Sequence, residues 1–138
     1  MSKLKNCILN KDSSYVPIWF MRQAGRYLPE FQKIRLENKN FIKLCLNSNL
    51  SSEITLQPLK RFDLDAAIIF SDILMVPNSI GQKVKFEKDK GPILEDFNLK
   101  FFLENDEHAM VKKLNPVYEA IKTVRKSLDK SKSLISFV

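Results

Sequence analysis

The chain has 138 residues, of which 44% are hydrophobic and 28% charged, and it carries a formal net charge of +7. This composition is that of an ordinary globular domain, which excludes a disordered or collagen-like chain. No apolar run approaches the roughly 18 residues of a membrane span, and residues 1–10 lack the apolar core of a secretory signal. We therefore expect a cytoplasmic protein with no membrane partner, too short for a closed eight-stranded barrel.

The cysteines and the positive charge give little indication of a ligand. Cys7 and Cys45 show no CxxC spacing, so we predict two free thiols and no metal site. The net charge would suit a polyanion, but the lysines are spread along the chain, as on solvated helix faces. No recognised nucleic-acid-binding motif accompanies the charge, so we expect no nucleic-acid partner.

Three short apolar runs mark the expected strands. Residues 1–16 are polar and lysine-rich, and we interpret them as a lead-in segment with a single helical turn. Residues 17–21 form an apolar and aromatic run that predicts a first strand buried on both faces. Residues 66–70 form the second run, and residues 134–138 form the third.

Helices are expected between the first two strands. One is predicted over residues 29–37, a second over residues 41–46, and a third from a cap at Ser51 or Ser52 to about Phe62. A strand, helices and a further strand in this order are typical of a parallel crossover unit.

The second half of the chain alternates turn and helix signals. Charged and apolar residues alternate over residues 83–88, and a turn at residues 89–92 follows, which predicts a hairpin outside the main sheet. Asp106 is expected to cap a short helix through Lys113, and Pro116 to start another. The predicted fold class is α/β, with about three strands and flanking helices.

The arginines are unevenly placed. Arg22, Arg26 and Arg35 lie within fourteen positions of a chain that has eighteen lysines and five arginines. A guanidinium group grips a carboxylate at two points through a fixed fork of donors, which the lysine ammonium cannot do. This cluster predicts carboxylate recognition.

An acidic residue follows the second apolar run. If the first two runs are adjacent parallel strands, Arg22 and Asp72 emerge on the same rim, because active sites of strand–helix barrels form at the carboxyl ends of the strands. In a generic protein an Asp at this place more often caps a turn, here one beginning at Ile73.

Residues 17–35 resemble the N-terminal signature of the uroporphyrinogen decarboxylase family, through Trp19 and the stretch MRQAGRYLPE at residues 21–30. Three further matches follow in order, TLQPL, LDAAIIFSDIL and KGPIL, which begin at residues 55, 64 and 90. The resemblance covers residues 17–138 and looks like only the first part of the family's protein. It implies a partial (β/α)8 TIM-barrel domain over residues 17–138, incomplete because about three of eight strands are encoded.

The resemblance also implies a reaction. Members of this family are carboxy-lyases of heme and porphyrin biosynthesis that convert the four acetate side chains of uroporphyrinogen III to the methyl groups of coproporphyrinogen III, without a cofactor or metal. Asp72 would accept hydrogen bonds from pyrrole N–H groups and stabilise the cationic intermediate, and Arg22 and Arg26 would complete the catalytic set. The family is homodimeric.

The resemblance implies a larger set of residues that bind the tetrapyrrole, and it contains Arg22, Gln23, Ala24, Gly25, Arg26, Arg35 and Asp72. The alternative for the arginines is a salt-bridge network with Glu30 and Glu37. Trp19 and Tyr27 are expected to pack rather than to bind ligand, Phe70 to lie in the core, and His108 to lie on the surface.

Alternative functions remain open. The chain can be a truncated, non-catalytic relic that at most binds porphyrin carboxylates. A related cobalamin-linked methyltransferase branch lacks the RQAGRY signature and uses zinc ligands that would be encoded later. Because most of the family's cleft would be missing, we expect the isolated chain to be inactive and prone to self-association through an open strand edge.

Overall fold

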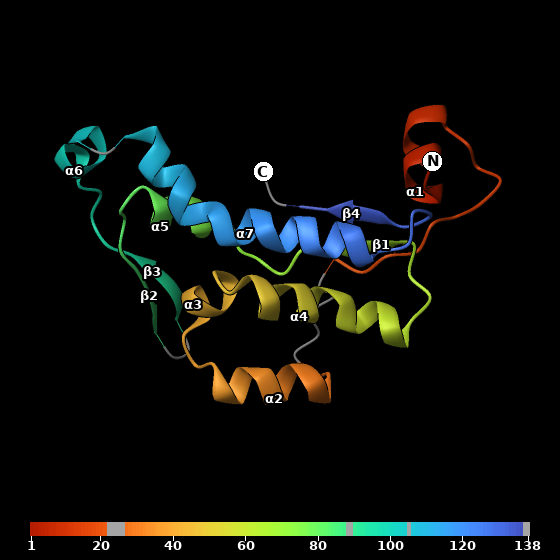
Figure 1. The fold of residues 1–138 in the computed structure, drawn as a ribbon, viewed down its shortest axis with the longest axis horizontal. Helices are drawn as coiled ribbons and strands as arrows, with labels where there is room; N and C mark the ends of the chain where they lie inside the picture. Colours follow the sequence, from red (N-terminus) through yellow and green to blue (C-terminus); the bar gives the residue numbers. More distant parts are fainter. Residues whose placement is uncertain (22–26, 88–89, 105, 137–138) are drawn as a thin grey trace.

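The computed structural model describes residues 1–21, 27–87, 90–104 and 106–136 (Figure 1). In chain order the helices and strands are α1 Lys3–Asn10, α2 Pro29–Glu37, α3 Phe41–Cys45, α4 Ser48–Arg61, β1 Ala66–Ile68, α5 Met75–Ser79, β2 Val84–Glu87, β3 Gly91–Leu94, α6 Leu99–Glu104, α7 Glu107–Ser127 and β4 Ser133–Ile135. The fold class is therefore mixed α/β, as predicted.

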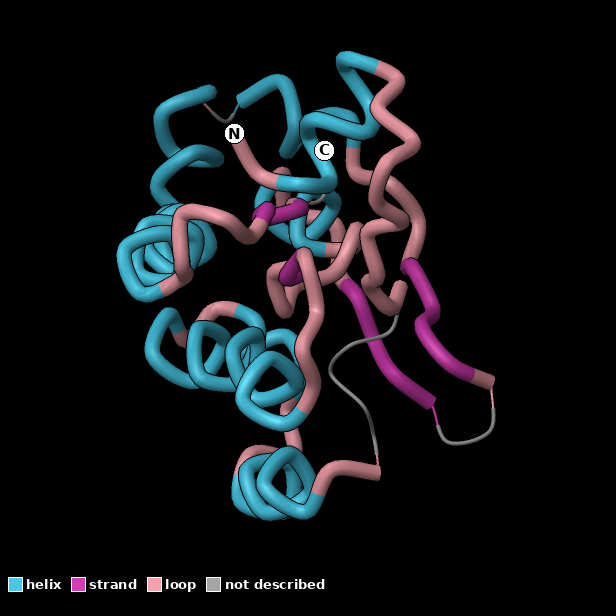
Figure 2. The backbone as a smooth tube through the Cα atoms, turned by 90° about the vertical axis from the view of Figure 1, so that its right-hand side faces the viewer, coloured by secondary structure: helices cyan, strands magenta, loops and turns pink. Residues whose placement is uncertain are grey.

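A short parallel sheet joins the two halves of the chain. β1 pairs with β4 in parallel, with Ala66 opposite Ser133 and Ile68 opposite Ile135. On the helix side, Ile69 packs against buried residues of α7. Figure 2 shows α2, α4 and α7 stacked beside this pair, with the hairpin projecting on the other side. The predicted strands at residues 66–70 and 134–138 are confirmed in part. β1 ends at Ile68, β4 covers Ser133–Ile135, and residues 137–138 lie outside the described ranges.

The predicted first strand, residues 17–21, is wrong. The segment bonds to the residue just before β1, where Asp65 N donates to Ile18 O and Ile18 N donates to Asp65 Oδ2, both at 2.8 Å. Phe20 and Met21 are 47% and 77% exposed. A strand of this apolar kind is stabilised by layers on both of its faces, and that burial is not present here. The parallel sheet thus has two strands in the described residues, not the expected three.

The predicted hairpin is confirmed. β2 and β3 pair antiparallel in a sheet of their own, with Val84 opposite Leu94 and Glu87 opposite Gly91. Gly91 has φ +84°, a left-handed conformation that glycine adopts without the strain imposed by a side chain. Residues 88–89 of the predicted turn lie outside the described ranges.

The helices after the arginine-rich segment follow the prediction with one correction. α2 has the predicted bounds, and α3 ends one residue early. The predicted cap of α4 at Ser51 or Ser52 is wrong, because Asn47 caps this helix by accepting a hydrogen bond from Leu50 N at 3.0 Å. Asparagine is as good an N-cap as serine, so the helix begins at the earlier signal and both serines are buried inside it.

One long helix replaces the two that were predicted over residues 106–128. Asp106 caps α7 as expected, accepting from His108 N at 2.9 Å, but the helix continues through Pro116. An internal proline costs about 3 kcal/mol or more. Burial of Ala120 and Val124, both 0% exposed, offsets this cost by holding the second half of the helix against α4 and Ile69.

Near the N-terminus, α1 is longer than the single turn that was expected. Two short helices in the second half of the chain, α5 and α6, were not predicted. Ser2 caps α1 by accepting from Lys5 N, and its Oγ lies 2.6 Å from Ser133 Oγ in β4. No helix in the described ranges combines the length and the hydropathy that crossing a bilayer requires.

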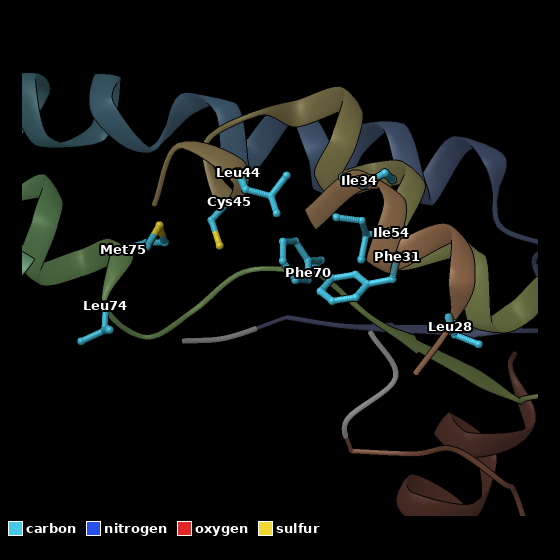
Figure 3. Close-up of a cluster of buried hydrophobic side chains, with 9 residues drawn as sticks. All are labelled: Leu28, Phe31, Ile34, Leu44, Cys45, Ile54, Phe70, Leu74 and Met75. Atoms are coloured by element: carbon cyan, nitrogen blue, oxygen red, sulfur yellow. The ribbon is translucent and has the colours of Figure 1, made fainter. Parts of the chain in front are cut away.

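The main hydrophobic core lies between α2, α3, α4 and the segment that follows β1 (Figure 3). Phe70 lies near its centre, with its ring 6.0 Å from the rings of both Phe31 and Phe41. The prediction that Phe70 is a core residue is confirmed. This core fixes α2 against the carboxyl end of β1, and the candidate site forms at that junction.

Candidate functional site

A cavity of about 1270 Å³ opens where α2 and α3 face the chain leaving β1. The hairpin supplies part of its wall. The lining residues are Phe31, Gln32, Arg35, Leu36, Lys39, Asn40, Phe41, Ile42, Lys43, Asp72, Ile73, Leu74, Asn78, Val84, Phe86 and Pro92. Two residues predicted from the sequence to bind ligand, Arg35 and Asp72, thus share one cavity.

Arg35 is half-buried in the last turn of α2, and its Nη1 donates to Asn38 O at 2.5 Å. The alternative pairing with Glu30 is not seen, because Arg61 holds both oxygens of that carboxylate at 2.6 and 2.8 Å. This contact lowers the pKa of Glu30 to about 2. Within the described part of the chain no carboxylate pairs with Arg35, so its guanidinium group retains donors for a ligand.

Asp72 caps a turn and also lines the cavity. Its Oδ1 accepts from Leu74 N at 2.9 Å, and its main-chain oxygen accepts from Met75 N at 3.1 Å. The capping interpretation of this residue is therefore correct as far as Oδ1 is concerned. The second carboxylate oxygen, Oδ2, has no hydrogen-bond donor among the described residues, and it remains available to a ligand in the cavity.

Cys45 lies close enough to both charged groups for each to act on it. Burial raises the pKa of its thiol to about 12, the Asp72 carboxylate adds to the rise, and the Arg35 guanidinium opposes it. A thiol with this pKa stays protonated at neutral pH and is a poor nucleophile and metal ligand. Cys45 and Cys7 are both free, as predicted.

The cavity combines positive charge with aromatic walls. Lys39 and Lys43 line it together with Arg35, and Asp72 is the acidic residue among the lining residues. Phe41 and Phe86 meet edge to face across its wall, with ring centroids 5.2 Å apart. The arrangement can hold a large apolar ring system whose substituents are carboxylates.

The two lysines were missed at the level of sequence. Arg35, Lys39 and Lys43 recur at intervals of four residues, a spacing that places side chains on one side of a helix. Because α2 ends at Glu37 and α3 begins at Phe41, that spacing alone predicts no shared face across the break.

The rest of the predicted site lies outside the described residues. This holds for Arg22, Gln23, Ala24, Gly25 and Arg26, so the shared rim of Arg22 and Asp72 stays a prediction.

Other side chains were singled out in the sequence. Trp19 is 36% exposed, and Tyr27, expected to pack, is 63% exposed and lies outside the described core. His108 is exposed, as expected. In the described ranges no group of three His, Cys, Asp or Glu side chains is placed to hold a metal ion.

The parallel strand pair and the cationic cavity at the carboxyl end of β1 define an α/β protein with a candidate ligand site at a strand end. A family model described as Uroporphyrinogen decarboxylase (URO-D) matches residues 1–138. The chain is 48% identical to the uroporphyrinogen decarboxylases of Rickettsia felis, Orientia tsutsugamushi and Rickettsia massiliae, over 94%, 99% and 99% of its length. The chain belongs to the uroporphyrinogen decarboxylase family.

The alignments cover nearly all of this chain but less than half of each relative. The aligned regions make up 37%, 40% and 39% of those three relatives. The chain thus spans about two fifths of the length of the curated relatives it matches, and it corresponds to their N-terminal part.

Proposed function

We propose that this chain is the N-terminal part of a uroporphyrinogen decarboxylase, the enzyme that converts uroporphyrinogen III to coproporphyrinogen III in heme biosynthesis. The observation that carries the proposal is the cavity shared by Arg35 and Asp72, in a chain that belongs to this family. The ligand is a tetrapyrrole with carboxylate side chains.

Asp72 has the central chemical role in this proposal. Its Oδ2 accepts hydrogen bonds from pyrrole N–H groups. Protonation of the pyrrole carbon beside an acetate creates a cation that takes up the electrons of the breaking C–C bond as carbon dioxide leaves. The methylene carbon then takes up a proton, and the proton on the ring carbon is released to restore the pyrrole. The carboxylate stabilises that cation, and the apolar walls strengthen the attraction by lowering the local dielectric constant.

The arginines hold the substrate. Arg35 binds a propionate through two parallel N–H···O bonds, a geometry that gives orientation as well as affinity. Arg22 and Arg26 bind further carboxylates and complete the catalytic set with Asp72. The main chain of Gln23, Ala24 and Gly25 contributes the remaining contacts.

We also propose a domain organisation, an oligomeric state and a cellular location. Residues 1–16 form a lead-in segment, and residues 17–138 form part of a (β/α)8 TIM-barrel domain. The whole enzyme works in the cytoplasm as a homodimer without a cofactor, and neither nucleic acid nor membrane is a partner.

Equilibrium binding of coproporphyrin III tests the proposal. Titrating the purified chain and following porphyrin fluorescence should give saturable binding that Asp72→Asn and Arg35→Gln each weaken. Lys126→Gln removes a charge from the exposed face of α7 and is the matched control for Arg35→Gln. The absence of saturable binding, or equal weakening by all three substitutions, would count against the proposed site.

A further inference from the structure

We propose that Ser51 and Thr55 are positioning residues for Asp72, because their two buried hydroxyl groups fix the point at which the chain leaves the parallel sheet. The inference rests on the proposed function, since it takes Asp72 to be the group that meets the ligand. It concerns residues of α4 that do not line the cavity.

The two hydroxyl groups bind both main-chain polar groups of one residue. Ser51 Oγ donates to Phe70 O at 2.6 Å, and Phe70 N donates to Thr55 Oγ1 at 2.8 Å. Thr55 Oγ1 in turn donates to Ser51 O at 2.7 Å, which fixes its own orientation. Ser51 and Thr55 are each 1% exposed, and their spacing of four residues places them on one side of the helix. We call this set of three bonds the hydroxyl clamp.

The hydroxyl clamp binds the main chain at the residue that follows the last bond of the parallel sheet. Ile69 N still donates to Ile135 O at 2.9 Å, so the main chain follows the parallel ladder up to this residue. At Phe70 the two main-chain groups bond to α4 instead. A buried N–H or C=O without a partner is costly, so the path of the chain at Phe70 is set by where α4 presents these hydroxyl groups.

Asp72 follows only two residues later, and its turn is closed on the far side by Leu74 N and Met75 N. The short segment between the clamp and this turn leaves the carboxylate little freedom to move. The ring of Phe70 also contacts Phe31 on α2, the helix that carries Arg35 (Figure 3). The clamp therefore sets the position of Asp72 relative to the arginine across the cavity.

Two substitutions at one position separate the hydroxyl group from the shape of the side chain. Thr55→Val keeps the branched shape and removes the hydroxyl, and Thr55→Ser keeps the hydroxyl and removes a methyl group. Val124→Ala is the control for lost stability, because Val124 is 0% exposed in a core cluster that does not contain Phe70.

Hydrogen exchange measures positioning without any ligand. The Leu74 amide, which donates to Asp72 Oδ1, should exchange at least about tenfold faster in Thr55→Val, relative to the Leu128 amide at the end of α7. Thr55→Ser and Val124→Ala should leave this ratio near the wild-type value. An unchanged ratio in Thr55→Val would overturn the inference.

Binding of coproporphyrin III shows whether the clamp acts through Asp72. Thr55→Val should weaken binding by about tenfold in the wild-type background and add almost nothing in the Asp72→Asn background, because groups that act together are not additive. Unchanged binding in Thr55→Val, or equal weakening in both backgrounds, would refute the inference. If the wild-type chain binds no porphyrin, the proposed function fails, and the exchange of the Leu74 amide alone decides whether the clamp positions the turn.

Discussion

Arg35 and Asp72 line one cavity and act in opposite directions on the same buried thiol, that of Cys45. They come from different parts of the chain, the last turn of α2 and the turn after β1. A cation and an anion thus line one aromatic-walled cavity, which is what the proposed tetrapyrrole ligand, with its carboxylates and pyrrole N–H groups, requires.

Cys45 should report this arrangement through its reactivity. In a Cys7→Ser background, alkylation by iodoacetamide should be slow at pH 8, because the thiol is 0% exposed and because its pKa is raised to about 12 by burial and by the Asp72 carboxylate. Asp72→Asn should lower that pKa and speed alkylation, whereas Arg35→Gln should raise it and slow alkylation. Rates that change in the same direction for both substitutions would contradict the opposed action of the two charges.

The Glu30–Arg61 pair should make stability depend on pH. The pKa of Glu30 is lowered to about 2 from an ordinary value of 4.5, so the pair stabilises the folded chain above about pH 4.5 and loses this effect as the pH falls towards 2. Glu30→Gln should therefore lower the thermal midpoint at pH 7, and the difference from wild type should vanish near pH 2. Glu37→Gln, on the same helix but without an ion-pair partner in the described residues, is the control. A difference that stays constant with pH would rule out this role.

Turnover should require more polypeptide than this chain provides. Purified chain incubated with uroporphyrinogen under anaerobic conditions should form no coproporphyrinogen, because two parallel strands build only part of the proposed cleft. A fusion to the remaining part of the Rickettsia felis relative should restore activity, and Asp72→Asn in that fusion should reduce kcat by about 100-fold or more. Normal turnover by the chain alone, or a fully active Asp72→Asn fusion, would disprove this account of the mechanism.

Lys39 and Lys43 should contribute affinity for carboxylates. The double substitution Lys39→Gln with Lys43→Gln should weaken coproporphyrin III binding several-fold at low salt, and the loss should shrink as ionic strength rises and screens exposed charges. Lys112→Gln with Lys126→Gln removes the same charge from α7 and should have little effect. If both double substitutions weaken binding equally, the affinity is determined by the net charge of the chain and not by the lysines of the cavity.

Local signals predicted the elements that depend on local interactions. Pro29 opens α2, Asp106 caps α7, and the alternating residues before Gly91 form the hairpin, since caps and turns are fixed by residues a few positions apart. The prediction of a strand at residues 17–21 was wrong. An apolar pattern indicates that a segment can be buried, but it does not show which helices or strands will cover the segment. In the same way, Pro116 signals a helix start that tertiary packing overrides.

The candidate site was predictable only in part. Arg35 was singled out by the arginine cluster and Asp72 by its place after an apolar run, and the family resemblance gave both a role. They share the cavity, but Lys39 and Lys43, which also line it, lie on either side of the start of α3, where no helical spacing from α2 predicts them. The hydroxyl clamp was invisible in the sequence, since a serine and a threonine inside a helix usually indicate only weak helix propensity.

The bond between the hydroxyl groups of Ser2 and Ser133 links positions 131 residues apart in the chain. Contacts of such high sequence separation carry the entropy of closing a long loop and slow the folding of small proteins. We therefore expect the attachment of α1 to β4 to be a late event in refolding, formed after the hairpin and after α4 has docked on β1. It follows that α1 and β4 meet only once the rest of the molecule is already native.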